Sequence, residues 1–378
     1  MEFTCDVLNI TERTLFSLRS LYSRYGYQQY RMSKFEEYDL YSRNKDFLVS
    51  DSVITFTDTN GRLMALKPDV TLSIVKNVKD LPGTLHKLCY NESVYRVSQS
   101  SGSFREILQT GLECIGKVDS CCIGEVLWLA AGSLEMISPD FVLEISHLGV
   151  MEALVNRISE DASVRQAVLK CVGEKNLHGI DALCRRQNIP EALAAPLKQL
   201  LSLYGSPARV LPAVEALCEE YQLAEAAAEL RQALSVFTGS DLFSRIQIDF
   251  SVVCDPNYYN GIVFKGFING VPESVLSGGQ YDRLMQRMGR SAHAIGFAVY
   301  LDVLERFTAE SDEYDADIML LYDDTAEPSG LRSAMQGLID QGKRVLAGKA
   351  ANPRLKFRQL AQYQNGGVVF LEPESENA

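Results

Sequence analysis

The sequence lacks an excess of basic residues, and this limits the partners it can have. Its 378 residues include 37 Lys and Arg against 49 Asp and Glu, which gives a formal net charge of −12. No run of Lys or Arg compensates locally, so the chain has no broad electrostatic attraction for phosphate backbones. Nucleic acid is therefore a poor default partner.

Cysteine pairs with CxxC spacing and long apolar runs are also missing. The 9 cysteines are scattered without a CxxC pair, and this spacing indicates neither a zinc site nor a disulfide framework. The N-terminus, MEFTCDVLNITERTL, has no basic segment followed by an apolar stretch, and no uninterrupted apolar run is long enough to span a bilayer. We expect a cytoplasmic protein that inserts into no membrane and holds no metal.

What the chain does contain is enough apolar material for two or three domains, since 46% of its residues are hydrophobic. Apolar residues at helical spacing predict an amphipathic helix over residues 10–25, which Gly26 would end. From about residue 46 to 116 short β-rich runs alternate with turn signals, and a helix is predicted within 68–78. These patterns predict an antiparallel sheet interleaved with helices.

The rest of the chain divides into three further segments. Residues 150–240 are rich in Ala, Leu, Glu, Gln and Arg, which indicates a helical insertion. Strand signals return at 246–253, 261–268 and 294–299, so one domain is built from two distant segments, 1–149 and 241–309. Residues 310–378 predict a small α/β domain with helices at 330–341 and 356–363. The fold class is therefore α+β.

Polar residues beside predicted strands are the first candidates for a site. Asp69 in LKPDVT and Glu113 are carboxylates in apolar settings, and with the Gln109 amide they could hold an ammonium group through charge-assisted hydrogen bonds. An amino acid's α-amine would suit them. The alternative, which spacing alone favours, is that Asp69 caps a helix and Glu113 points outward from a strand.

Three other groups of residues have an equally plain alternative. Tyr258 and Tyr259 would point to opposite faces if 257–264 is a strand, so at most one would line a given cavity. The glycine pair before Tyr281 could bring backbone close to a ligand, although Gly pairs are more often simple turns. Arg96 and Arg105 could meet a phosphate or carboxylate, or belong to a solvated hairpin loop.

Taken in order, these clusters resemble the catalytic domain of the histidyl-tRNA synthetases, a class II aminoacyl-tRNA synthetase family, over roughly the whole chain. The family's second motif runs from an aromatic-Arg pair through a charged loop to Gln-x-Gly-x-Glu. Matching residues here are Tyr95, Arg96, Arg105, Gln109, Gly111 and Glu113. The loop departs from the pattern, because Ser98 and Gln99 replace a glutamate and an arginine.

Two further arginines of the family pattern are absent. Before the tyrosine pair the family has Arg-Gly-Leu-Asp, whereas this chain has Cys254, Asp255, Pro256 and Asn257. The third motif ends in Gly-Leu-Glu-Arg, and the corresponding positions here include Tyr300, Asp302 and Val303. Neutral side chains cannot supply the positive charge that stabilises a triphosphate during adenylate formation. We therefore predict no aminoacylation and no enzymatic activity.

The retained positions are those with which the family holds free histidine. By this resemblance the histidine-binding residues are Asp69, Thr71, Arg105, Gln109, Glu113, Tyr258, Tyr259 and Gly279. The combination is similar to the synthetase-like regulatory subunits of ATP phosphoribosyltransferase in histidine biosynthesis. That resemblance implies a short-form catalytic subunit as partner, a homodimer within a hetero-oligomer, feedback inhibition by histidine, and no cofactor.

Two other functions remain open on the sequence alone. One is an active histidyl-tRNA synthetase with divergent motifs, which would adenylate histidine with ATP. The other is a synthetase-derived module that senses histidine for a different partner. The small C-terminal segment lies where the synthetases carry an anticodon-binding domain, but it is short and not strongly basic, so we do not expect it to read tRNA.

Overall fold

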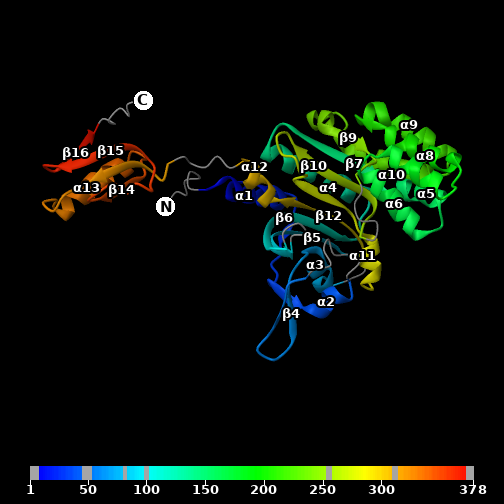
Figure 1. Ribbon diagram of the computed structural model, residues 1–378, viewed down its shortest axis with the longest axis horizontal. Helices are drawn as coiled ribbons and strands as arrows, with labels where there is room; N and C mark the ends of the chain where they lie inside the picture. The colour runs from blue at the N-terminus through cyan, green and yellow to red at the C-terminus, as the bar shows by residue number, and fades with distance from the viewer. Residues whose placement is uncertain are drawn as a thin grey trace. The chain divides into compact units, whose positions relative to one another are not determined.

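A computed structural model describes residues 8–44, 53–79, 83–97, 102–252, 258–308 and 314–371, with the side chains of 305–308 left out. The chain divides into two compact units, Met1–Thr308 and Ala309–Ala378. The first unit carries the large sheet and the candidate site (Figure 1).

A sheet of nine strands runs through the first unit, among the residues described. In spatial order its strands are β1 (Gln28–Gln29), β5 (Leu85–Val97), β6 (Phe104–Gly116), β12 (His293–Tyr300), β11 (Leu276–Gln280), β10 (Asn260–Ile268), β7 (Phe141–His147), β9 (Ile246–Asp249) and β8 (Tyr204–Gly205). From β5 to β7 every neighbouring pair is antiparallel. The predicted antiparallel sheet, assembled from two distant segments of the chain, is confirmed.

One face of this sheet is covered by helices α1 (Ile10–Arg24), α4 (Ser120–Ile137) and α12 (Leu301–Thr308) (Figure 1). The larger apolar core fills this layer. Helix α1 confirms the predicted N-terminal helix: Asn9 caps it in a capping box with Glu12, and Gly26 follows it at φ +83°. Helix α4 is long and apolar enough to cross a membrane, yet its apolar side chains pack in the core, as in many soluble proteins.

The opposite face carries a second, smaller core and the short helices α2 (Tyr38–Ser42), α3 (Thr71–Asn77) and α11 (Asp282–Arg287). Beside them a small antiparallel sheet has the order β2 (Phe35–Glu37), β4 (Leu63–Leu66) and β3 (Thr55–Thr57). The helix predicted within 68–78 begins at Thr71 and not at the proline, because Asp69 accepts the backbone N–H of Leu72 and so caps the first turn.

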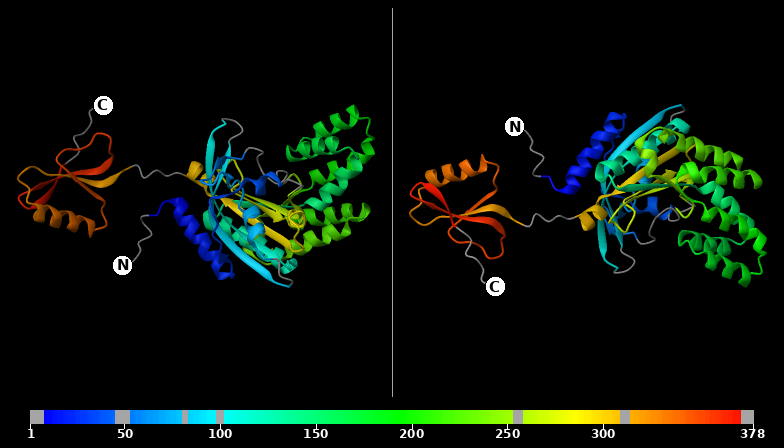
Figure 2. Two further views of the ribbon diagram at one scale, coloured as in Figure 1. Left: turned by 90° about the horizontal axis from the view of Figure 1, so that it is seen from below. Right: turned by 90° about the horizontal axis from the view of Figure 1, so that it is seen from above.

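The predicted helical region forms between β7 and β9 and gathers at one end of the sheet (Figure 2). Its helices are α5 (Leu148–Ile158), α6 (Ala162–Gly173), α7 (Leu177–Arg186), α8 (Glu191–Ser202), α9 (Pro207–Glu220) and α10 (Ala224–Leu234), followed by the 3₁₀ turns η3 (Ser235–Phe237) and η4 (Asp241–Arg245). Its apolar residues join the larger core. We call α5–α10 the helical insertion.

Within its described residues, 314–371, the second unit has a four-stranded sheet in the order β14 (Val345–Gly348), β13 (Ala316–Leu321), β15 (Phe357–Gln364) and β16 (Gly367–Leu371), with helix α13 (Pro328–Ile339). The helix predicted at 356–363 is wrong, because that segment is β15. Its Leu, Ala and Gln residues favour a helix, but parallel pairing with β13 and a hairpin through Asn365 and Gly366, both at positive φ, override that propensity.

One turn interpretation and one strand prediction in the first unit also need correction. The segment Ser277–Gly279, interpreted as a possible turn, lies inside β11, the strand between β10 and β12. The strand predicted at 246–253 is shorter, since β9 ends at Asp249. Glycine weakens an isolated strand, but here it allows close packing: a Cβ at Gly278 would lie 2.4 Å from the Gly296 carbonyl oxygen and 2.5 Å from Phe297 Cβ.

Candidate functional site

The candidate site is built on one row of residues across the large sheet. Glu113 of β6 pairs with Gly296 of β12, which pairs with Gly279 of β11. Residues paired in this way point to the same face of a sheet, so the row places one carboxylate beside two positions without side chains. The two glycines leave the space above the strands for the Glu113 side chain and its partners.

The Glu113 carboxylate lies in this space with both oxygens occupied. It accepts a hydrogen bond from Thr71 Oγ1 at 2.7 Å through Oε1 and from the Tyr281 hydroxyl at 2.6 Å through Oε2. A Cβ at Gly296 would lie 1.8 Å from Oε2 and 2.5 Å from the Leu112 carbonyl oxygen, so only glycine fits there. The alternative in which Glu113 points outward is wrong, since its side chain is 2% exposed.

Burial controls the charge of this carboxyl group. Desolvation raises the pKa of Glu113 from 4.5 to about 8, while the hydrogen bonds from Tyr281 and Thr71 act in the lowering direction. The nearby Asp69 adds a further raising contribution. At neutral pH the pocket therefore favours a protonated Glu113 until a positive group arrives to pair with it.

Asp69 and Thr71 reach the site from the start of α3. Asp69 is partly exposed, and its Oδ1 accepts the Leu72 N–H at 2.8 Å, so the capping alternative describes one of its roles. Desolvation raises the pKa of Asp69, and Arg96 lowers it by its charge. The charge of Asp69 acts in the raising direction on the pKa of Tyr258 and of Glu113.

Ties to β5 hold the LKPDVT segment in place. The Tyr95 N–H donates to the Lys67 carbonyl at 2.9 Å, and Arg96 Nε donates to the Pro68 carbonyl at 3.1 Å. The fully buried Lys67 ammonium pairs with Glu92 at 2.5 Å. Desolvation lowers the pKa of Lys67, and Glu92 opposes that effect. The segment that carries Asp69 and Thr71 is thus fixed by groups outside the pocket.

The start of α3 forms one wall of the site. Tyr258, Tyr259 and Tyr281 form the other, which we call the tyrosine wall. The rings of Tyr258 and Tyr259 lie 4.6 Å apart, and Tyr281 lies 6.0 Å from Tyr258. Both Tyr258 and Tyr259 precede β10, which begins at Asn260, so the opposite-face expectation for a strand over 257–264 does not hold. Thr71 hydrogen bonds to Tyr258 as well as to Glu113, which links both walls. Gly279 lets Tyr259 approach, because a Cβ there would lie 2.9 Å from its ring.

Gln109 and Arg105 lie further along β6. Gln109 is buried on the face of Glu113 but four residues away, about 13 Å at 3.4 Å per residue, and the Tyr90 hydroxyl lies over Gly111 between them, 2.6 Å from where a Cβ would be. Arg105 lies eight residues away, about 27 Å, and its Nη2 pairs with Asp302 at 3.4 Å. The structure therefore brings together six of the eight predicted residues, with Gln109 beyond them and Arg105 apart.

Parts of two motifs fall outside the described residues. These parts are residues 98–101 of the second-motif loop and residues 253–257, which include Cys254 and its neighbours. Val303, at the position of the family's third-motif arginine, is described and is 5% exposed within the larger core.

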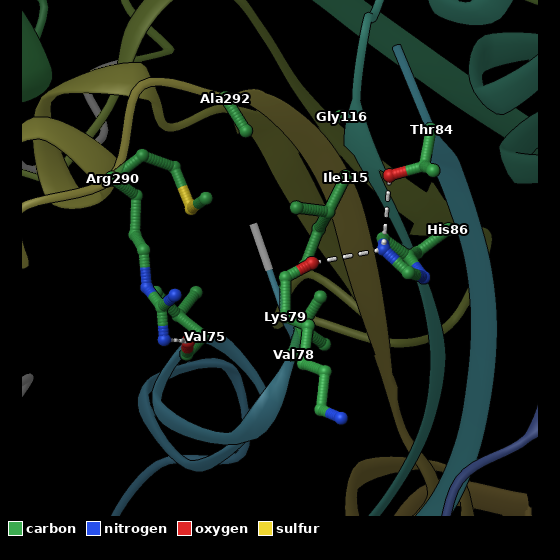
Figure 3. Close-up of a pocket in the computed structure, with 10 residues that line it drawn as sticks. Val75, Val78, Lys79, Thr84, His86, Ile115, Gly116, Arg290 and Ala292 are labelled. Atoms are coloured by element: carbon green, nitrogen blue, oxygen red, sulfur yellow. Dashed lines mark hydrogen bonds between the residues drawn. The ribbon is translucent and has the colours of Figure 1, made fainter. Parts of the chain in front are cut away.

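A separate small cavity lies at the far end of α3 (Figure 3). It has room for about one water molecule. In it His86 Nε2 hydrogen bonds to the Lys79 carbonyl at 3.1 Å, and Arg290 Nη2 donates to the Val75 carbonyl at 3.3 Å (Figure 3). None of the predicted site residues lines this cavity. The hydrogen bond from Arg290 joins α3 to the segment that follows α11.

Sequence reasoning missed two residues of the site, Tyr281 and Gly296. The sequence places Tyr281 only beside a glycine pair and Gly296 only within the strand predicted at 294–299. Neither has a signal in its own segment, because the role of each depends on lying opposite Glu113. The strand pattern at 294–299 placed Gly296 in the sheet, but the register with β6 was needed to find its neighbour.

The arrangement is suited to holding a cation. The Glu113 carboxyl group lies beside Tyr281, whose ring neighbours Tyr258 and through it Tyr259, and burial raises the pKa of Tyr90, Tyr258 and Tyr281 well above the usual range. Among the described residues no group of His, Cys, Asp and Glu has the arrangement of a metal site. An organic ammonium or imidazolium would give the buried Glu113 carboxyl group a charged partner.

The sequence matches the model of a known family. A family model described as histidyl-tRNA synthetase matches residues 8–304. The chain belongs to the histidyl-tRNA synthetase family. Its fold is accordingly that of the class II aminoacyl-tRNA synthetases, as expected from the motifs.

Relatives within and around this family carry a more specific name. An ATP phosphoribosyltransferase regulatory subunit of Alkaliphilus metalliredigens is 28% identical over 287 residues, which cover 74% of this chain and 72% of the relative. A structure from Bacillus halodurans, described as an ATP phosphoribosyltransferase regulatory subunit/histidyl-tRNA synthetase, has a TM-score of 0.74 at 21% identity and covers 93% of each chain. A chain of the Thermotoga maritima ATP phosphoribosyltransferase complex has a TM-score of 0.59 at 20% identity, covering 77% of this chain and 97% of that one. At these identities the two structures show a shared fold.

Proposed function

We propose that the chain is a non-catalytic regulatory subunit of ATP phosphoribosyltransferase in histidine biosynthesis, and that it binds free histidine in the pocket around Glu113. The observation that carries the proposal is the buried carboxyl group of Glu113, with the partly exposed Asp69 and a wall of tyrosines beside it. The names of the relatives supply the pathway.

Histidine fits the chemistry of this pocket. Its α-ammonium can pair with one carboxylate, and its imidazole can stack on a tyrosine ring and hydrogen bond to a hydroxyl or to the other carboxyl group. Thr71 and Tyr281 hold Glu113 in position for either group. Gln109 is a further buried amide on the same face of the sheet, beyond these residues.

Aminoacylation is absent in this proposal because the cations needed for ATP are missing or engaged. Arg105 pairs with Asp302, and Arg96 donates to the Pro68 carbonyl. Val303 replaces the third-motif arginine and is buried in the core. Tyr300 pairs across the sheet with Gln109, so a tyrosine side chain occupies the face where the family pattern has glycine.

The partner is the catalytic subunit of ATP phosphoribosyltransferase, and the assembly is a cytoplasmic hetero-oligomer that contains a homodimer of this chain. Support comes from the names of the relatives and from the Thermotoga maritima complex. Histidine can inhibit such an assembly only if it binds one state more tightly than another, which requires a coupling free energy of about 1–3 kcal/mol.

A divergent histidyl-tRNA synthetase is the second candidate, because the matching family model carries that description. Calorimetric titration of the purified chain with histidine, then with ATP, and with other amino acids as controls separates the two. Histidine binding without ATP binding supports the regulatory subunit, whereas tight ATP binding with histidine-dependent pyrophosphate exchange supports the synthetase. Binding of neither ligand would refute a histidine pocket.

Reconstitution then tests the partner. The purified chain is mixed with a short-form ATP phosphoribosyltransferase catalytic subunit, and the mass of the complex and the rate of the transferase reaction are measured with and without histidine. We expect a larger complex, a faster reaction and inhibition by histidine. A histidine-binding chain that leaves the catalytic subunit unchanged would indicate a sensor for another partner.

A further inference from the structure

Helix α11 joins two parts of the first unit that the proposed function treats separately. It has six residues, Asp282–Arg287, and follows directly after Tyr281, whose hydroxyl donates to Glu113. A helix of this length is not stable by itself in water. Its position is therefore set by the contacts of its side chains, which act on Tyr281 together with the hydrogen bond from the Tyr281 N–H to the Ala294 carbonyl at 2.9 Å.

Asp282 fixes the first turn of α11 to both neighbouring strands. Its Oδ1 accepts the Ala294 N–H of β12 at 2.9 Å, and its Oδ2 accepts Asn260 Nδ2 of β10 at 3.2 Å and lies 2.9 Å from His293 Nδ1. Asn260 also accepts the Arg283 N–H at 3.3 Å. Because Asn260 follows the Tyr258–Tyr259 pair and Asp282 follows Tyr281, this contact ties the two tyrosine segments of the pocket together.

Arg283 points away from the pocket and reaches the helical insertion. Its Nη1 and Nη2 donate to the two carboxylate oxygens of Glu152 in α5, both at 2.6 Å. Two parallel charge-assisted bonds fix the relative orientation of the groups more strictly than one bond does. The Glu152 side chain is 18% exposed, so solvent screens this pair less than a fully exposed one.

The far end of α11 is held as well. Arg290, three residues after the helix, donates to the carbonyls of Val75 and Lys76 at the C-terminal end of α3 (Figure 3). Thr71, at the N-terminal end of the same α3, donates to Glu113. Contacts at both ends thus restrict α11, and the Glu152 pair is the link that leads out to the insertion.

We propose that α11 positions the tyrosine wall of the pocket through Asp282 and Arg283, and that the Arg283–Glu152 pair makes histidine affinity depend on the helical insertion. The inference rests on the proposed histidine pocket. Arg283 and Glu152 act as positioning residues that do not touch the ligand. By thermodynamic linkage, histidine then stabilises the attachment of the insertion as much as that attachment favours histidine.

A charge swap tests this inference. The variants are Glu152→Arg, Arg283→Glu and the double swap, with Glu215→Gln as a matched control that breaks an ion pair with Arg231 inside the insertion. Histidine affinity is measured by calorimetry, and hydrogen exchange of the amides of residues 281–287 is measured without ligand. We expect each single variant to lose at least about fivefold in affinity and to exchange faster, the swap to restore both, and the control to change neither.

Wild-type affinity in the folded single variants, or a swap that restores nothing, would overturn the inference while leaving the histidine pocket intact. If the wild-type chain binds no histidine, the proposed function fails, and ligand-free exchange alone decides the positioning role: unchanged exchange in both single variants overturns it. Should Glu152→Arg not fold, Glu152→Gln gives the same comparison because it removes the charge with little change in size.

Discussion

The substitution Glu113→Gln separates the effect of the Glu113 carboxyl group on stability from its effect on binding. In the folded chain burial raises its pKa from 4.5 to about 8, so at pH 7 it is mostly protonated when folded and ionised when unfolded. The stability contributed by the protonated group is complete below about pH 4.5 and is lost as the pH rises through about 8. At about 1.4 kcal/mol per pKa unit, the loss reaches about 3 kcal/mol at pH 7.

Glutamine has nearly the shape of the protonated carboxyl group and does not ionise. We therefore expect Glu113→Gln to equal the wild-type chain in unfolding free energy near pH 4 and to exceed it by up to about 3 kcal/mol at pH 7. Urea unfolding at pH 4, 7 and 9 measures this difference. A glutamine variant that is less stable at pH 7 than the wild-type chain would contradict a neutral Glu113 in the empty pocket.

Histidine binding should change in the opposite direction. An ammonium requires the ionised carboxylate, so the wild-type chain releases a proton on binding, and its affinity rises about fivefold between pH 7 and pH 8 beyond the ligand's own titration. Glu113→Gln cannot provide this charge, so we expect a loss of about ten- to a hundredfold and no such rise. Titration calorimetry in buffers of different ionisation enthalpy counts the protons. No proton release by the wild-type chain would refute the reasoning.

Three other predictions follow from the same contacts. Gly296→Ala places a Cβ 1.8 Å from Glu113 Oε2, so we expect a lower melting temperature and no histidine binding, whereas Gly337→Ala, with open space at that position on α13, should be neutral or stabilising by about 1 kcal/mol. Tyr281→Phe removes a hydrogen bond that lowers the pKa of Glu113, so the rise in affinity should move to higher pH in the same calorimetric series. Lys67→Met leaves Glu92 without its cation and should cost about 3–5 kcal/mol in urea unfolding; the additional change Glu92→Gln should recover most of it, and no recovery would contradict the ion-pair account.

Much of the fold could be predicted from the spacing of apolar residues and from the residues that end helices and strands. The N-terminal helix follows from the apolar spacing over residues 10–25 and ends where Gly26 predicts. The helical insertion and the return of strands after it follow from composition. Local signals were sufficient in these segments because propensity, pattern and tertiary contacts agree.

The predictions failed where pairing with a distant strand decides the conformation. The segment at 356–363 has helix-forming residues but lies between β13 and β16 as a strand. Glycines 278 and 279 form part of β11 because they pair with β10 and β12, whose atoms leave no room for a side chain at either position. Neither result has a cause in the local sequence, since both depend on which strand lies alongside.

The sequence by itself predicted most of the elements in the first unit, the family, and six residues that lie in or beside the candidate site, because side-chain chemistry and motif spacing are properties of the chain. Tertiary structure alone decided the register that sets Glu113 opposite Gly296, the contact with Tyr281, the distance to Arg105 and the bridge from α11 to Glu152. It also decided the protonation of Glu113, since desolvation is caused by atoms that are remote in sequence and come together only when the sheet forms.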